Sequence, residues 1–388
     1  MSSKQSWDTV SLIELIDSNR PITYGILKPG PDIEDGVPYV RVVDLQGGEV
    51  QSSQIRRTTT DIAHQYRRST LKAGDVLMSI RGHVGRCGVV PTSLIGANIT
   101  QDTARLAVNG KCDSRFLLWC LRSPEIQRWM AKHTKGVAVT GINLGDVKQI
   151  PIPLPTLSEQ KRIAGILDQA DGLRRKRQQA LALTDHLAPS IFREMFGSRD
   201  SRGLRWSTST VGDAVNLTNG RAFKSSDWKK EGLPIIRIQN LKNSDASFNY
   251  FDGEYDDQHL VEPGALLIAW AGQLVSFGVH LWPGPAGVLN QHIFKVTPKG
   301  KYSPVFLHQA LSEVIERAKS QFHGIDMKHI TKSDLVSHEI PNPPYEMQCE
   351  FARRVSVAES IRSRCFTAAK RDEQLFNSLV QRAFRGEL

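Results

Sequence analysis

The pattern of apolar and polar positions along this 388-residue chain occurs twice. In each half, short β-like apolar runs separated by glycine and proline precede one amphipathic helix. The first half is expected to have strands at residues 39–45, 75–81, 86–90 and 103–108 and a helix at 114–132. The second half is expected to have strands at residues 234–241, 265–270, 277–282 and 292–296 and a helix at 303–321. This order predicts an α+β domain of roughly 150 residues in each half.

A longer helical pattern follows each of these domains. A proline-rich segment, 151–156, leads into a helix expected at residues 157–196. The similar segment 340–344 leads into a second helix expected at residues 345–384. A helix of this length spans roughly 60 Å at 1.5 Å per residue, far more than one small domain needs. We therefore expect the two helices to form a spacer, with an ordinary helical hairpin that supports a core as the alternative.

Both long helices carry a stripe at alternating spacings of three and four, which is typical of a coiled coil. In the first helix the stripe comprises Ile163, Ile166, Ala170, Leu173, Arg177, Ala180, Thr184, Leu187 and Ile191. In the second helix it comprises Phe351, Val355, Ala358, Arg362, Cys365, Ala369, Phe376, Leu379 and Ala383. Thr156 is expected to cap the first helix while Glu159 reaches back to the cap backbone. Two equivalent helices related by a twofold axis run antiparallel, so the duplication predicts a pseudo-dimer.

The repeat also predicts the domain boundaries. A polar linker at residues 197–203 separates the halves. The expected segments are a globular domain at 1–155, a helix at 156–197, a second globular domain at 198–344 and a second helix at 345–388.

Composition narrows the kind of partner. The net charge is +10 and the pI is about 9.4, which favours a polyanion such as nucleic acid. The chain has no apolar stretch typical of a signal peptide and no run of about twenty apolar residues, so we expect a cytoplasmic protein with no membrane association. The five cysteines match no metal-ligand spacing, so we expect reduced thiols and no metal.

Three segments resemble the conserved regions of specificity subunits of type I restriction-modification enzymes. They are residues 152–163, 173–177 and 381–388, and the order of domain, helix, domain, helix extends the resemblance over essentially the whole chain. The match is weaker at residues 347–350, which replace 159–162 of the first helix.

This resemblance implies a non-catalytic subunit with two target recognition domains. Each domain would read one half of a bipartite site in double-stranded DNA, and the helices would set the separation. The halves differ in detail, so the implied site is asymmetric. Two methyltransferase subunits and two ATP-driven restriction subunits would assemble around the chain. S-adenosylmethionine, ATP and Mg would then belong to the partners, and this chain would bind no cofactor.

Two other classes of protein remain alternatives. The string Asn342–Tyr345 spells an active-site signature of amino-methyltransferases, which would make the chain a stand-alone DNA adenine methyltransferase. Its counterpart in the repeat, residues 154–157, is a helix entry, and the sequence has no glycine-rich motif for S-adenosylmethionine. The third class is a coiled-coil adaptor without DNA function.

Candidate DNA-contacting residues follow from side-chain chemistry. Arginine can pair with guanine, asparagine or glutamine with adenine, and lysine mostly meets phosphate. In the first half the candidates are Arg81, His83, Arg86, Asn98, Gln101, Lys135 and Asn143. In the second half they are Gln273, Asn290, Gln291, His323 and Lys328. Asn98 and Gln101 match Asn290 and Gln291, and residues shared by both halves favour a role in the fold or at phosphate. The basic run 174–177 is either a solvated helix face or lies over spacer phosphates.

Overall fold

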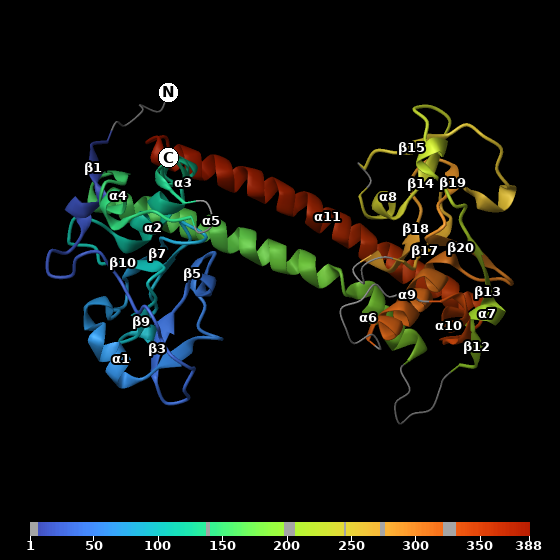
Figure 1. The fold of residues 1–388 in the computed structure, drawn as a ribbon, viewed down its shortest axis with the longest axis horizontal. Helices are drawn as coiled ribbons and strands as arrows, with labels where there is room; N and C mark the ends of the chain where they lie inside the picture. Colours follow the sequence, from blue (N-terminus) through green and yellow to red (C-terminus); the bar gives the residue numbers. More distant parts are fainter. Residues whose placement is uncertain (1–6, 137–139, 198–205, 244–245, 272–275, 321–330) are drawn as a thin grey trace. The chain divides into compact units, whose positions relative to one another are not determined.

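The computed structural model describes residues 7–136, 140–197, 206–243, 246–271, 276–320 and 331–388. It divides into two compact units, unit 1 with residues 1–178 and 367–388, and unit 2 with residues 179–366. Each unit therefore contains one globular part and a stretch of both long helices (Figure 1). None of the helices in the described ranges combines the length and apolar character that crossing a membrane requires.

The described residues of unit 1 form three sheets. The largest has the order β2-β10-β7-β8-β5-β4, with β2 (Thr23–Tyr24), β10 (Thr103–Leu106), β7 (Val76–Ser79), β8 (Cys87–Val89), β5 (Gly48–Val50) and β4 (Leu45–Gln46). The others are β6 (Arg56–Thr58), β3 (Val37–Val40) and β9 (Asn98–Ile99), and the pair β1 (Thr9–Ser11) and β11 (Pro151–Pro153). Its short helices are α1 (Thr60–Gln65), α2 (Ser114–Arg122), α3 (Pro124–His133) and α4 (Leu144–Lys148).

Unit 2 repeats this plan. One sheet has the order β13 (Val215–Asn219), β20 (Ile293–Pro298), β17 (Leu266–Ala269) and β18 (Gly278–Leu281). A second has β15 (Asn249–Phe251), β14 (Leu233–Ile236), β19 (Gly287–Leu289) and β16 (Leu260–Val261), and β12 (Thr208–Thr210) pairs with β21 (Glu339–Pro341). Its short helices are α7 (Val211–Ala214), α8 (Ile238–Lys242), α9 (Pro304–Ser320) and α10 (Lys332–Ser337). The parallel pair of β3 with β9 in unit 1 has its equivalent in β14 with β19 in unit 2, which confirms the pseudo-symmetric α+β prediction. Unit 1 has a further parallel pair, β5 with β8.

The predicted strand regions all contain strands, but the first region in each half ends early. The strand stops before Arg41 because the Asp44 carboxylate accepts a hydrogen bond from the Arg41 backbone N–H at 2.8 Å and turns the chain. In unit 2, Asn240 does the same to Arg237 at 3.1 Å. Such local side-chain hydrogen bonds compete with strand pairing.

The helix expected at residues 114–132 is two helices, α2 and α3. Ser123 interrupts it, and its hydroxyl accepts a hydrogen bond from the Ile126 N–H at 3.3 Å as an N-cap. Pro124 then occupies the first turn of α3, where its missing N–H costs nothing. The equivalent α9 in unit 2 has no such break.

The first long helix was expected to be continuous over residues 157–196, and this prediction is wrong. It consists of α5 (Leu157–Thr184) and α6 (Leu187–Phe196). Pro189 explains the break, because proline lacks the N–H that would bond to the carbonyl of Asp185 and its ring clashes with that carbonyl. The second long helix, α11 (Tyr345–Phe384), is unbroken over its 40 residues as expected.

Each long helix is anchored to its domain by one buried glutamine. Gln160 is fully buried, and its side chain accepts from the Asp113 N–H at 2.8 Å and donates to the Pro155 carbonyl at 2.9 Å. Gln348 in α11 is 2% exposed, accepts from the Ser303 N–H at 3.0 Å and donates to a proline carbonyl at 3.0 Å. The same two hydrogen bonds, one accepted from the domain backbone and one donated to a proline carbonyl, therefore recur in both units.

Aromatic rings extend this packing in both units. Phe384 at the end of α11 lies with its ring 5.9 Å from Phe116 of α2 in unit 1. Phe196 at the end of α6 lies 5.1 Å from Phe306 of α9 in unit 2. Burying one such side chain contributes roughly 1.5 to 3 kcal/mol, so these contacts help to hold helix and domain together.

The stripe predicted for the first helix is only partly correct. In α5 the buried positions are Gln160, Ile163, Ala164, Leu167 and Asp171, whereas Leu173 is 69% exposed. The buried face follows the contact with the domain rather than a coiled-coil repeat. The stripe predicted for α11 is buried or half-buried at every position except Arg362.

The expected capping box at the start of α5 is only half formed. The Thr156 hydroxyl accepts from the Glu159 N–H at 3.4 Å. The Glu159 carboxylate does not reach back, because it forms two hydrogen bonds of 2.7 Å with Arg162. These hydrogen bonds hold the pKa of Glu159 below its ordinary value.

Candidate nucleic-acid interface

Three of the predicted DNA-contacting residues lie together at one edge of the large sheet of unit 1. Because β7 and β10 pair antiparallel, with Ser79 opposite Thr103, the residues just beyond this pair meet. The Arg81 guanidinium donates to the Gln101 side-chain oxygen at 3.2 Å. Arg81 also forms a backbone bridge with Gly141, which exchanges two hydrogen bonds of 2.8 Å with Lys135. The edge therefore presents a guanidinium, an amide and an ammonium group.

The loop between β7 and β8 carries two further candidates. Gly82 and Gly85 have positive φ values of 69° and 88°, a conformation that favours glycine. The hydroxyl of Ser79 donates to the carbonyl of His83 and accepts from the Arg86 N–H at 2.8 Å, which ties the loop together. The side chains of His83 and Arg86 are exposed. Both residues are therefore positioned for contact with a ligand.

Two of the candidates in the first half have structural roles. Asn98 is 1% exposed, and its carboxamide bonds to the Ser69 hydroxyl at 2.5 Å and to the Tyr66 carbonyl at 3.2 Å. Asn143 is exposed, but its carboxamide caps α4 by accepting from the Asp146 N–H at 2.8 Å and donating to the Asp146 carboxylate. The prediction that Asn98 contacts DNA is therefore wrong, because it is buried, and the amide of Asn143 is already engaged.

In unit 2 the two described candidates support the loop at residues 221–223. Asn290 forms a backbone bridge with Arg221, and the Gln291 side-chain oxygen accepts from the Phe223 N–H at 3.2 Å. Both residues are half-buried. The remaining candidates, Gln273, His323 and Lys328, lie outside the described residues.

The strand register corrects one match between the halves. Tyr39 pairs with Asn98 in unit 1, and the equivalent Ile235 pairs with Val288 in unit 2. Asn98 therefore corresponds to Val288, and Asn290 corresponds to Thr100. Gln101 and Gln291 remain equivalent. The spacing from the asparagine to the glutamine differs between the halves, so the sequence already carried a sign of this mismatch.

The basic run 174–177 is largely engaged in ion pairs. Arg174 and Arg175 both hydrogen-bond to Asp171, with shortest distances of 2.7 Å and 2.6 Å. Although burial acts to raise the pKa of Asp171, these bonds hold it below its ordinary value. Arg177 pairs with Asp372 at 3.2 Å. The three arginines of this run are therefore paired with carboxylates of the chain itself, and contact with spacer phosphates stays a prediction.

The methyltransferase-like string is a helix entry in the structure. The Asn342 N–H donates to the Ser207 carbonyl at 2.8 Å, and the Asn342 side-chain oxygen accepts from the Tyr302 hydroxyl at 3.3 Å. Tyr345 is the first residue of α11, and the Lys301 ammonium lies 4.3 Å from its ring centroid. The side chains of Asn342 and Tyr345 therefore stabilise the junction between domain and helix.

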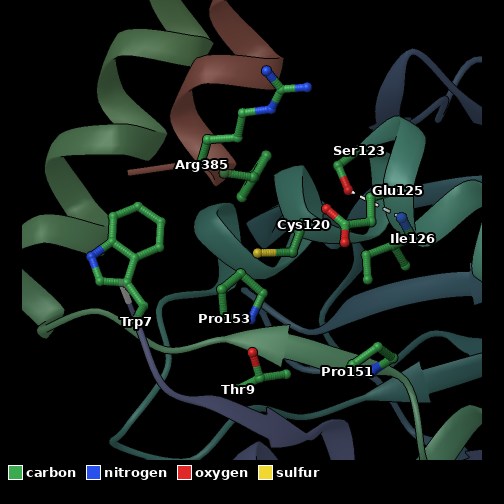
Figure 2. A pocket seen from close by; sticks show the side chains of 10 residues that line it. Trp7, Thr9, Cys120, Ser123, Glu125, Ile126, Pro151, Pro153 and Arg385 are labelled. Carbon is green, nitrogen blue, oxygen red and sulfur yellow. Dashed lines mark hydrogen bonds between the residues drawn. The ribbon is translucent and has the colours of Figure 1, made fainter. Parts of the chain in front are cut away.

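A hollow of about 490 Å³ lies elsewhere in unit 1, beside the β1–β11 pair and the break between α2 and α3 (Figure 2). Its lining residues are Trp7, Thr9, Cys120, Ser123, Glu125, Ile126, Pro151, Pro153, Phe384 and Arg385. Burial raises the pKa of Cys120, which keeps it a neutral thiol. None of the predicted DNA-contacting residues lines this hollow, so it is separate from the loop edge.

The chain has two equivalent domains, and each is anchored to a long helix and carries guanidinium or amide groups on its loops. This arrangement is typical of a nucleic-acid-binding protein with two recognition domains. The chain belongs to the family described as the type I restriction modification DNA specificity domain, whose model matches residues 4–183 and 204–363. The two matches correspond to the two halves of the repeat.

Individual relatives agree with this assignment. The chain is 35% identical over 197 residues to the specificity subunit of the type I restriction enzyme EcoBI of Escherichia coli, and the match spans 50% of this chain and 41% of that protein. The fold resembles a chain from a structure on complex assembly and conformational transition of the type I R-M system, with a TM-score of 0.63, 18% identity and coverage of 99% and 98%. It also resembles the type I S subunit of M. genitalium, with a TM-score of 0.55, 18% identity and coverage of 99% and 97%. No comparison supports the methyltransferase alternative.

Proposed function

We propose that this chain is the DNA-recognition subunit of a type I restriction-modification complex and reads an asymmetric bipartite site. Unit 1 would read one half of the site, unit 2 would read the other half, and the long helices would set the spacing. The subunit would act in the cytoplasm and contribute no catalytic group.

The repeated helix anchor is the observation that carries this proposal. Gln160 and Gln348 make the same bonds to their own domains, so each unit presents its loops in a defined relation to its own helices. The loop residues themselves differ, since the sequence of unit 2 has no arginine at the position equivalent to Arg81. Equivalent anchoring with unequal loops favours two readers with different half-sites.

Within unit 1, the exposed loop edge supplies the groups for DNA contact. Arg81 and Gln101 have the donors and acceptors that major-groove base edges recognise, while His83, Arg86 and Lys135 can meet phosphates. Gln273, His323 and Lys328 remain the candidates for unit 2.

Two exposed apolar positions support the docking of two methyltransferase subunits. Leu173 in unit 1 is 69% exposed and Ile361 in unit 2 is 44% exposed, and they are equivalent positions, 188 residues apart. One such position in each unit matches two copies of one partner. Phe192 and Phe196 are buried in the core of unit 2, and Phe384 packs against the core of unit 1, so these aromatic residues support their own units. S-adenosylmethionine would bind the methyltransferase subunits, and ATP and Mg would serve two restriction subunits.

Mapping methylated adenines tests the proposal. The chain is co-expressed with its methyltransferase subunit, and methylated positions are located by single-molecule sequencing. We expect one asymmetric bipartite motif. Replacing residues 7–145 with the corresponding domain of another specificity subunit should change one half of the motif and leave the other half and the spacing intact. A change in both halves together would rule out independent reading.

A further inference from the structure

An arginine-lined cleft of about 540 Å³ lies in unit 1 between the β4–β5 turn, the start of β8 and the end of α2. Its walls include the Gly47–Gly48 turn, Arg86 and Arg122. None of the described residues that line it is acidic. We propose that this cleft binds one phosphate group.

The glycine turn leaves one wall of the cleft as bare backbone. Gly47 and Gly48 have positive φ values of 62° and 88°, as the two central residues of a tight type I′ hairpin require. A Cβ atom on Gly48 would lie 2.5 Å from the Arg122 Nη1 atom. Any larger residue would therefore displace the guanidinium, and glycine keeps Arg122 at the cleft.

Arg122 is positioned by an aromatic ring and a carboxylate. Its guanidinium lies 4.3 Å from the centroid of the Trp119 ring and 3.8 Å from the Asp171 carboxylate. Its Nη1 atom is buried and has no hydrogen-bond partner among the described residues. Burial lowers the pKa of Arg122, which Asp171 partly offsets. The Arg122 side chain is 21% exposed and lines the cleft, so its accessible N–H groups can donate a charge-assisted hydrogen bond to a bound phosphate oxygen.

The carboxylates beside the cleft are already neutralised. Asp171 bonds to Arg174 and Arg175, and Arg175 also pairs with Glu49 at 3.1 Å and donates to the carbonyl of Gly47. Burial raises the pKa of the Cys87 thiol in the cleft wall to about 12, so this group carries no charge at neutral pH. The two arginines in the wall therefore face no free negative charge.

Unit 2 lacks the equivalent groups. The strand registers place Gly278 where unit 1 has Arg86, and the alignment of α9 with α2 places Ser312 where unit 1 has Arg122. The hollow of about 1100 Å³ beside Ser312 is lined by several carboxylates, including Glu313 and Glu359. Its lining has four carboxylates against three arginines, which favours an anion less than the acid-free cleft of unit 1 does, so we infer the phosphate site for unit 1 only.

A phosphate of the DNA backbone and a free phosphate ion share the required chemistry. Arg86 connects the cleft to the loop edge, because it ends the same loop that carries Arg81 and His83. The DNA form of this inference rests on the proposed function. Loss of a contact to one backbone phosphate should weaken binding to all sequences alike.

The first arm of the test uses the complex of the full chain with its methyltransferase subunit. Binding is measured on duplexes in which single phosphates of the unit 1 half-site are replaced by neutral methylphosphonates. We expect about a tenfold loss at one position for the wild type. Arg86→Gln should bind unmodified DNA about tenfold more weakly, lose nothing further at that position, and lower the salt slope by about 0.9. Arg128→Gln, an exposed arginine of α3 outside the cleft, is the matched control.

The second arm titrates inorganic phosphate into the same complex without DNA, followed by phosphorus NMR. If Arg86→Gln removes the loss of affinity that one methylphosphonate causes in the wild type, a DNA phosphate binds in the cleft. Saturable phosphate binding that Arg86→Gln and Arg122→Lys weaken, without such coupling, places a free phosphate there. If neither effect occurs while the wild type still binds its motif, the cleft proposal is wrong and the proposed function stands. A wild-type complex with no sequence-dependent binding would instead overturn the proposed function.

Discussion

Arg174 of α5 pairs with Glu373 of α11 at 3.0 Å in unit 1. Their equivalents form the same pair in unit 2, where Arg362 of α11 bonds to Asp185 at 2.8 Å. Arg174 and Arg362 are 188 positions apart, and so are Asp185 and Glu373. The first long helix therefore supplies the arginine in unit 1, whereas α11 supplies it in unit 2. A second pair in each unit, Arg177 with Asp372 and Arg354 with Glu194, shows that the paired stretches run antiparallel within each unit. Each pair contributes only about 0.3 to 1 kcal/mol, so its main value is to set the register of the helices.

Lengthening α5 should lengthen the spacer of the recognised motif. Four residues inserted near Ala180 add one helical turn of about 6 Å at 1.5 Å per residue. This corresponds to one or two base pairs at roughly 3.4 Å each. We expect methylation of the same half-sites with one or two more unspecified bases between them, measured by single-molecule sequencing.

A single inserted residue serves as the control, because it rotates the following helix by about 100° and disrupts its packing. That variant should mainly lose stability. Retention of the original spacing by an active four-residue variant would show that the helices do not set the distance.

Removing one glutamine anchor should destabilise one unit selectively. Gln160→Ala leaves the Asp113 N–H and two carbonyls without their buried partner, which should cost about 2 to 4 kcal/mol of unfolding free energy. Urea unfolding followed by hydrogen exchange should show the loss in unit 1. Gln348→Ala should weaken unit 2 instead, and Gln169→Ala, an exposed position of α5, should change little. Equal losses in both units for either variant would contradict this local role.

Acid should destabilise unit 2 through His280. Burial lowers the pKa of His280 to about 4, so the folded state keeps it neutral. The unfolded state takes up a proton below about pH 6.5, so stability falls as the pH drops from 6.5 towards 4. We expect a loss on the order of 1 to 2 kcal/mol between pH 7 and pH 5, measured by urea unfolding at each pH.

The variant His280→Leu should flatten this dependence in unit 2. His308, whose pKa burial also lowers, accounts for the part that remains. An unchanged slope in the variant would mean that other groups control the acid sensitivity of the unit.

Introducing charge at the exposed apolar pair should reduce the number of bound methyltransferase subunits. Leu173→Arg or Ile361→Arg alone should leave one subunit bound per chain, and the double variant none, because each charge would be desolvated in the interface. Native mass spectrometry of the co-expressed complex gives the count. Leu183→Arg is the control, because this exposed position already has an arginine, Arg371, as its equivalent. Two subunits retained by the double variant would exclude this docking position.

Most of the architecture could be read from local patterns. Strand regions, α11 and the internal repeat depend on the spacing of apolar residues within short windows, and the structure contains each of them. The break before α6 was also encoded locally, by Pro189, but the continuing apolar spacing concealed it.

The availability of side chains depended on contacts between distant segments. Asn98 and Asn143 have the right chemistry for DNA, yet Asn98 bonds to Ser69, 29 residues away in the sequence, and Asn143 caps its own helix. The basic run in α5 found its carboxylates on other turns, on α11 and on β5. The Arg86–Arg122 cleft combines residues from three separate segments. A polar group is free for a ligand only when no closer partner satisfies it, and those partners are set by packing rather than by spacing along the chain.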